Sequence, residues 1–126
     1  MNFSKEYIEL CKNKKIQELR PKLQKGDWVI WNNDVKEITV VCELFLPKPE
    51  DLKLYIWLPT TEQLDEEIIK ICKENNYCYY FHFIAYAPLD SVYKASILQI
   101  ENLEMRDSNP LICKIKLLIK LLEEDK

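Results

Sequence analysis

The sequence predicts an α+β fold in which helices pack on a mostly antiparallel sheet of about five strands. Strand-length runs of β-branched and aromatic residues occur in pairs separated by short polar turns, which is typical of hairpins. Helical spacing of apolar residues appears in separate segments near the start, the middle and the end of the chain. The predicted order is α-β-β-β-α-β-β-α, which lacks the regular strand–helix alternation of a parallel sheet.

The length of 126 residues predicts a single domain over residues 1–126. Hydrophobic residues make up 48% and charged residues 31%, as in ordinary globular chains. The apolar runs are too short to span a membrane, and the N-terminus lacks the apolar run of a signal peptide. We therefore expect a cytoplasmic protein without a membrane partner.

The first element is a helix from Ser4 to about Leu19, with Ser4 as its N-cap and Pro21 preventing its continuation. Strands are expected over 27–31 and 37–46. The Asn and Asp residues between them favour a tight turn, so the two strands are predicted to pair as a hairpin.

A third strand, 52–58, is almost continuously apolar, which predicts a central place in the sheet. Pro59 ends this strand, and a helix follows. Thr60 and Gln63 match the capping box, in which each side chain satisfies a backbone N–H of the first turn. The acidic residues of that first turn are explained by the helix dipole rather than by a metal site. The apolar stripe of this helix consists of Leu64, Ile68, Ile71 and Cys72.

Two further strands, 77–87 and 93–101, are predicted to form a second hairpin. The chain closes with a helix. Its N-cap is Ser108 or Asn109, and Pro110 occupies the favoured first helical position.

Three short motifs resemble a known group of proteins. They are Gly26–Asp27–Trp28, the strand end Ile56–Trp57–Leu58–Pro59, and the pair Gln63–Leu64. Together with the apolar closing helix, they resemble small uncharacterised prophage-encoded proteins of Firmicutes. The second half of the chain is also similar to the phage α-β-α sandwich domain. The resemblance implies a phage or prophage setting in a bacterial host cell, and it implies a fold rather than a mechanism.

Composition excludes several kinds of site. The net charge of −3 argues against direct nucleic-acid binding, which normally needs a basic surface. The single glycine, Gly26, precedes a strand, so no phosphate-binding loop is available. We expect no metal and no cofactor, because the cysteines lack metal-ligand spacing and only one histidine accompanies them. The five cysteines are odd in number, which predicts reduced and mostly buried thiols: Cys11, Cys42, Cys72, Cys78 and Cys113.

The single histidine, His82, lies within the predicted strand 77–87. Strand alternation places it on one face with Tyr80 and Tyr86. His82 is then either a hydrogen-bonded residue on a half-covered sheet, or part of an aromatic platform formed by Tyr80, His82 and Tyr86. The sequence shows no second catalytic group to act with His82, so we expect no catalytic residue and no enzyme.

The last helix has a wide apolar arc. Its expected core stripe consists of Leu111, Ile112, Ile115, Leu118, Ile119 and Leu122. Cys113, Leu117 and Leu121 fall outside that stripe. Either the helix is wedged between the sheet and the N-terminal helix, or these three residues form a partner or self-association surface, with a C2 homodimer as the default.

These patterns favour a non-enzymatic phage or prophage accessory protein that binds a host or phage protein, such as an inhibitor of a bacterial defence system of the anti-CRISPR type. The alternative is a small-molecule binder that sequesters a nucleotide signal at a dimer interface. That interface would be lined by Tyr80, His82, Tyr86 and Arg106.

Overall fold

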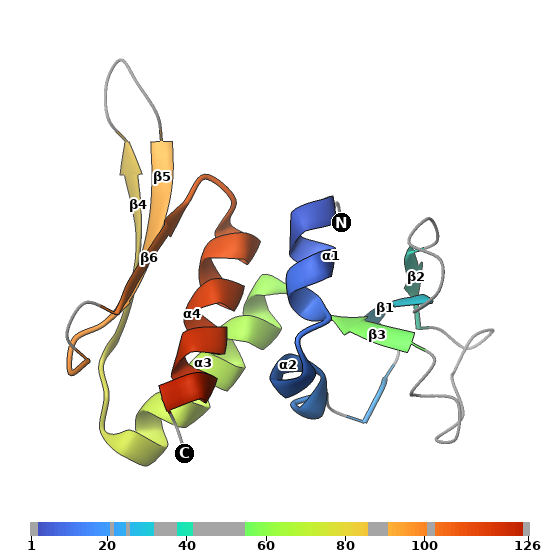
Figure 1. The fold of residues 1–126 in the computed structure, drawn as a ribbon, viewed down its shortest axis with the longest axis horizontal. Helices are drawn as coiled ribbons and strands as arrows, with labels where there is room; N and C mark the ends of the chain where they lie inside the picture. The colour runs from blue at the N-terminus through green and yellow to red at the C-terminus, as the bar shows by residue number, and fades with distance from the viewer. Residues whose placement is uncertain are drawn as a thin grey trace. The chain divides into compact units, whose positions relative to one another are not determined.

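The computed structural model describes residues 3–20, 22–24, 26–31, 38–41, 55–85, 91–100 and 103–124 (Figure 1). It confirms the α+β class. The chain divides into two compact units, Met1–Thr60 and Thr61–Lys126, and each is described by itself. The single domain over residues 1–126 stays a prediction.

The first unit begins with two short helices where one helix was predicted. They are α1 (Lys5–Cys11) and α2 (Lys14–Glu18). Ser4 caps α1 as predicted, and its side chain accepts a hydrogen bond from the Tyr7 N–H. The break occurs because Asn13 caps α2, accepting hydrogen bonds on its side-chain oxygen from the N–H groups of Lys15 and Ile16. Asparagine competes with the helix for backbone donors in this way.

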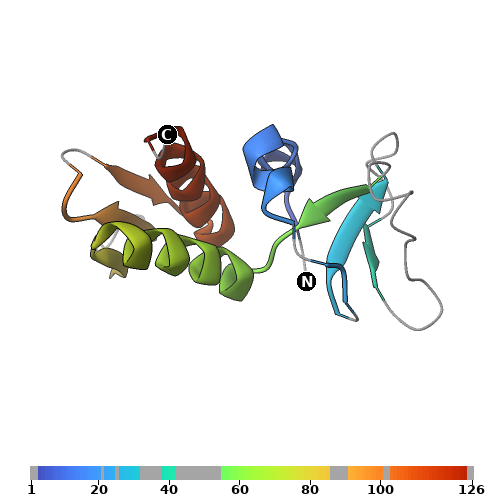
Figure 2. The same ribbon diagram turned by 90° about the horizontal axis from the view of Figure 1, so that it is seen from below.

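The first unit also contains an antiparallel sheet of three described strands, in the order β2-β1-β3. These are β1 (Trp28–Trp31), β2 (Ile38–Val40) and β3 (Tyr55–Leu58), visible in Figure 2. The predicted pairing of the first two strands is confirmed, and the predicted turn between them lies outside the described residues. Among the described strands β1 is central and β3 is outermost, so the predicted central position of the third strand is not found there. The prediction failed because the apolar run of β3 reflects the burial of both its faces, and not the presence of a strand on each side.

A tight turn leads into β1 and closes the core of this unit. Gly26 has a φ of 100°, in the left-handed region that favours glycine, and its N–H donates to the Val41 carbonyl at 2.8 Å. The Asp27 carboxylate accepts from the Gln24 N–H at 2.8 Å. The core beneath consists of Leu23, Val29, Val41 and Trp57, with Leu19 and Tyr55 packed against it.

The second unit runs from helix to sheet to helix. Its elements are α3 (Thr61–Asn75), β4 (Tyr79–Ala85), β5 (Ser91–Ile97), β6 (Glu104–Asp107) and α4 (Pro110–Glu124). The described strands form an antiparallel sheet in the order β4-β5-β6, and the predicted second hairpin is β4–β5. Strand β5 ends at Ile97, whereas the prediction extended it to residue 101. Strand β6 was not predicted, because three of its four residues are charged and it contains no apolar run.

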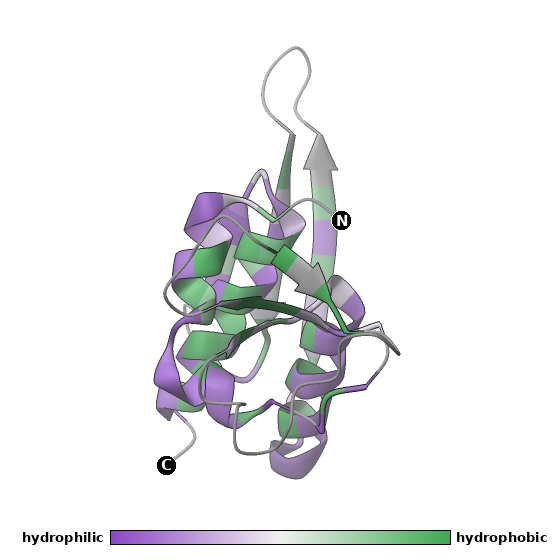
Figure 3. Cartoon of the chain, turned by 90° about the vertical axis from the view of Figure 1, so that its right-hand side faces the viewer, coloured by the Kyte–Doolittle hydropathy of each residue, from purple (hydrophilic) through white to green (hydrophobic). Residues whose placement is uncertain are grey.

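The helix ends of this unit follow local capping rules. Helix α3 starts at Thr61, so Thr60 occupies the predicted N-cap position. Asn109 rather than Ser108 caps α4, because its side-chain oxygen accepts from the N–H groups of Leu111 and Ile112. Apolar and polar bands alternate along the helices (Figure 3). Within the described residues, none of the helices has the length and apolar character needed to cross a membrane.

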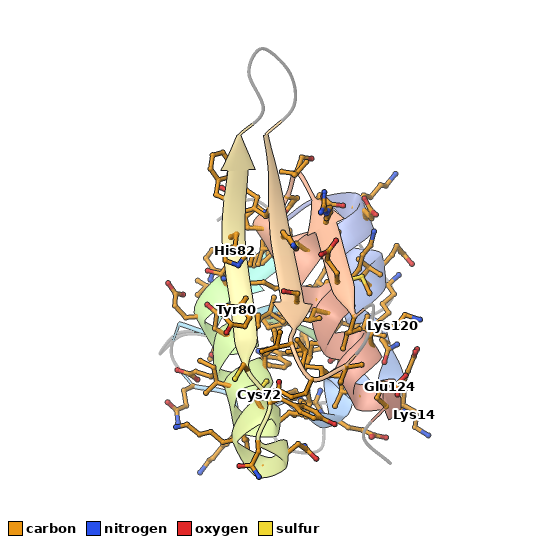
Figure 4. All side chains as sticks on the ribbon, turned by 90° about the vertical axis from the view of Figure 1, so that its left-hand side faces the viewer. Lys14, Cys72, Tyr80, His82, Lys120 and Glu124 are labelled. Carbon is orange, nitrogen blue, oxygen red and sulfur yellow. The ribbon has the colours of Figure 1, made fainter. Side chains whose placement is uncertain are left out.

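Helices α3 and α4 pack against each other and cover one face of the β4–β5–β6 sheet (Figure 1). The opposite face carries side chains that point away from these two helices (Figure 4). This arrangement gives the second unit an inner sheet face that belongs to its core and an outer sheet face that does not.

Candidate interaction surface

The strand register determines which side chains share the outer sheet face. Directly opposed residues of antiparallel strands lie on the same face. One row across the sheet joins Tyr80, Ser96 and Glu104, and the next joins His82, Lys94 and Arg106. We call these six residues the outer face. The inner face, towards the helices, contains Tyr79, Phe81, Phe83, Tyr93, Ala95 and Met105.

An aromatic pair lies at the β4 side of the outer face. The rings of Tyr80 and His82 are stacked, with centroids 6.0 Å apart and planes inclined by 7°. Both side chains are exposed, Tyr80 to 42%. The strand alternation predicted this placement of Tyr80 and His82, and their role as a platform stays a prediction. Tyr86, the third residue of the predicted platform, lies outside the described residues.

A cluster of charges lies beside the aromatic pair. The Glu104 carboxylate accepts from Lys94 Nζ at 2.9 Å and from Arg106 Nε at 2.9 Å. The hydrogen bond from Lys94, followed by that from Arg106, holds the pKa of Glu104 below its usual range. The cluster therefore presents two cations and one carboxylate next to the His82 ring.

A shallow hollow of about 290 Å³ opens at the Tyr80 end of the outer face. It is lined by Tyr80, Ser96, Ile97, Leu98, Ile100, Leu103 and Glu104. Leu98 lies in the turn after β5 and is 67% exposed, the highest value among the large hydrophobic residues that the structure describes. The hollow thus adds an apolar element to a face of aromatic and charged groups.

The structure corrects the prediction of a surface on the last helix. Cys113, Leu117 and Leu121 are all buried, at 1% exposure or less. The Cys113 thiol points at the sheet and donates to the backbone carbonyls of Tyr93 and Met105, at 3.4 and 3.3 Å. Leu117 and Leu121 follow Cys113 at intervals of four residues, so the three continue one stripe along α4. They are core residues and not a free partner surface.

The sequence analysis placed the buried side of α4 wrongly, because Lys114 lies on that side. Lys114 is only 6% exposed, although lysine is rarely buried without a partner. Its ammonium bonds the Asp65 carboxylate at 2.9 Å and lies 4.2 Å from the centroid of the Phe81 ring. Asp65 also accepts from the Tyr79 hydroxyl at 3.0 Å, and burial followed by the nearby Asp65 raises the pKa of Tyr79. These interactions satisfy both charges inside the unit.

The cysteines agree with the expected reduced state where they are described. Cys11, Cys72 and Cys113 are free and buried, and Cys78 is free and exposed. Burial raises the pKa of the Cys11 thiol to about 12. Cys42 lies outside the described residues. No group of three or more His, Cys, Asp or Glu side chains in the described part of the chain could hold a metal ion.

Sequence reasoning missed Glu104 because it did not recognise β6, and it did not single out Lys94, although Lys94 lies within the predicted strand 93–101. The charged residues Glu104 and Arg106, two positions apart, were the available signal for an edge strand with an exposed face. Arg106, which was predicted to line a nucleotide site with Tyr80 and His82, does lie on the same face as both. No family model, no curated protein and no solved structure matches the chain.

Proposed function

We propose that the protein acts by binding another protein through the outer face of the β4–β5–β6 sheet. The observation that supports this most is the combination found there. A stacked Tyr80–His82 pair, an exposed Leu98 beside a hollow, and charges of both signs share one exposed surface. Tyrosine and arginine are enriched at binding hot spots, and a polar rim around an apolar centre is the usual anatomy of an interface.

Each part of the outer face has a complementary partner group. The hollow beside Tyr80 accepts an apolar or aromatic side chain of the partner. Glu104 between Lys94 and Arg106 leaves that cluster with an excess of one positive charge, which favours an acidic partner residue near Arg106.

The charge balance favours a protein partner over nucleic acid. Both cations of the cluster are engaged with Glu104, and the whole chain has a net charge of −3. Phosphate backbones need several uncompensated cations for useful affinity. The resemblance described above favours a phage or prophage accessory role, in which a non-enzymatic protein binds a host or phage protein, for example in a bacterial defence system.

A direct test compares outer-face variants with a variant elsewhere on the same unit. Tyr80→Ala and Leu98→Ser remove exposed side chains, and Ile69→Ser on α3, where Ile69 is 42% exposed, is the matched control. Affinity purification from a bacterial host identifies the partner, and calorimetry with the purified partner then measures affinity. Loss of a hot-spot side chain weakens binding by about 10-fold to 30-fold.

The expected result is weak binding by both outer-face variants and unchanged binding by Ile69→Ser. Equal affinity for all three variants and the wild type would refute the proposal. Circular dichroism and thermal melting of each variant check that the fold is retained.

A second candidate is a nucleotide binder, favoured by the stacked ring pair beside Lys94 and Arg106. Aromatic rings stack on bases, and the two cations could receive a phosphate. A thermal-shift series with nucleotides distinguishes this candidate, because stabilisation then rises with ligand concentration and disappears in Tyr80→Ala. An absence of any shift with nucleotides would refute this second candidate.

A further inference from the structure

Strand β4 has one backbone edge that pairs with no other described strand. The Leu98 N–H donates to the Cys78 carbonyl at 3.1 Å, so Cys78 directs its polar backbone groups towards β5. Successive residues of an antiparallel strand point these groups to opposite sides. The N–H and C=O groups of Tyr79, Phe81 and Phe83 therefore point away from β5, to the free edge.

Two other sheet edges of the chain are protected. At the β3 edge, the side-chain amide of Gln17 bonds both the N–H and the carbonyl of Trp57. At the β6 edge, the strand is only four residues long and carries charged side chains, including Glu104 and Arg106. Short length and edge charges are the usual means by which proteins prevent strand-to-strand association.

Strand β4 has neither protection. It is seven residues long, Tyr79–Ala85, and its sequence YYFHFIA contains no proline and no Lys, Arg, Asp or Glu. On its inner face Phe83 is 57% exposed, although it contacts Tyr93 with ring centroids 4.9 Å apart. A long, uncharged and aromatic edge is a template for another strand.

We propose that β4 pairs antiparallel with β4 of a second copy of this chain, which joins the two three-stranded sheets across a C2 axis. A two-fold axis perpendicular to the sheet makes the pairing antiparallel and keeps the inner faces on one side. The register that pairs all seven residues sets His82 opposite His82 of the second copy. Phe81 then lies opposite Phe83 of the second copy, which gives the exposed Phe83 ring an aromatic neighbour.

The second copy is favoured as the occupant because the edge is self-complementary in this register. Phe81 and Phe83 of one copy meet Phe83 and Phe81 of the other, and no formal like-charge pair from Asp, Glu, Lys or Arg is created within Tyr79–Ala85. The association of the two β4 strands also brings the stacked Tyr80 and His82 rings of both copies next to each other. The dimer then has one continuous outer face with twice the area. This inference stands independently of the proposed function, since it concerns the chain alone.

Analytical ultracentrifugation over a concentration series tests the association. The wild type is expected to sediment as a dimer, with twice the 15.1 kDa mass of the chain. Phe83→Lys places a charge on the free edge at an exposed position, and we expect it to be monomeric. Leu98→Lys adds the same charge at an exposed leucine in the turn after β5, and we expect it to remain dimeric.

Cross-linking tests the register without disturbing the fold. Paired residues that are not hydrogen-bonded to each other have Cα atoms about 4.5 Å apart, within the range that a disulfide spans. In a Cys78→Ser background, His82→Cys is therefore expected to form an intermolecular disulfide when diamide oxidises the two thiols. Lys94→Cys, on the same face but on β5, is the control and is expected to remain uncross-linked.

Any of four results would overturn the proposal. One is a wild type that stays monomeric at every concentration. Another is a dimer that survives Phe83→Lys, and the third is a dimer that does not cross-link at position 82. Capture of a different protein by β4 in place of a second copy would equally contradict it.

Discussion

The side-chain amide of Gln17 occupies the edge of β3 as a neighbouring strand would, by bonding both backbone groups of Trp57. Gln17 Oε1 accepts from the Trp57 N–H at 2.8 Å, and Gln17 Nε2 donates to the Trp57 carbonyl at 2.9 Å. The same nitrogen donates to the Cys11 carbonyl at 2.7 Å. A residue of α2 thus ties the edge of the first sheet to the end of α1.

We predict that Gln17→Ala lowers the free energy of unfolding by about 2–3 kcal/mol, because it leaves buried backbone groups of Trp57 without partners. Trp57 is only 1% exposed, so water cannot fully replace the lost amide. Urea denaturation followed by tryptophan fluorescence measures the change. Glu18→Ala, at the exposed neighbouring position of α2, is the control and should change stability by less than about 0.5 kcal/mol.

A second substitution separates hydrogen bonding from side-chain volume. Gln17→Glu keeps the shape and can still accept from Trp57, but a carboxylate cannot donate to the carbonyls of Trp57 and Cys11. We expect a loss of stability at least as large as for Gln17→Ala. A stable Gln17→Glu variant would show that the edge does not depend on this amide.

The sequence predicted elements whose signals are local. The antiparallel pairings of β1 with β2 and of β4 with β5 follow from apolar runs flanked by turn residues, and both pairings are present. The break at Asn13 was missed because asparagine is tolerated within a helix as well as at its N-cap, and only the tertiary structure decides between them. The edge position of β3 was missed because an apolar run reports buried faces, and it does not report which strand is the neighbour.

The outer face was predictable only where its signal is local. Alternation along one strand was enough to place Tyr80 with His82. The charges beside them come from β5 and β6, whose register depends on long-range pairing that no local pattern shows. The α4 surface was wrong because helical periodicity treats Lys114 as polar, whereas Asp65 and the Phe81 ring allow its burial.

We predict that Lys114→Ala lowers the free energy of unfolding by about 2–4 kcal/mol. It removes the packed aliphatic chain and the partner of Asp65 together. Lys114→Met keeps most of the volume and should recover at least half of that loss, since Asp65 is partly exposed and retains the Tyr79 hydroxyl. Thermal and urea unfolding provide the measurement.

Lys116→Ala is the matched control for Lys114. Lys116 lies on the same helix, and its ammonium is 3.8 Å from the Asp107 carboxylate at a partly exposed position. Pairs of this kind contribute about 0–1 kcal/mol. Equal losses for Lys114→Ala and Lys116→Ala would contradict a structural role for the buried lysine.

The described cysteines should differ in reactivity according to burial. We predict that iodoacetamide at pH 8 modifies Cys78 first in the native protein, because its side chain is exposed. Cys11 should remain unmodified until the protein unfolds, since it is fully buried and its pKa is raised to about 12. Peptide mapping by mass spectrometry over a time course measures each site. Modification of Cys11 as fast as Cys78 in the native state would contradict the packing of α1.

Alkaline pH should destabilise the fold through Tyr7. Its hydroxyl donates to the Pro59 carbonyl at 2.5 Å, and burial, followed by the neighbouring Cys11, raises its pKa. An unfolded phenol ionises near pH 10, so this contribution is present below about pH 10 and is lost as the pH rises further. We predict that the free energy of unfolding falls between about pH 10 and 11 by up to about 1.4 kcal/mol per buried phenol. Tyr7→Phe should be less stable at pH 8, because it loses the hydrogen bond, and should show a shallower fall above pH 10. A slope equal to that of the wild type would mean that Tyr7 ionises alike in the folded and unfolded states.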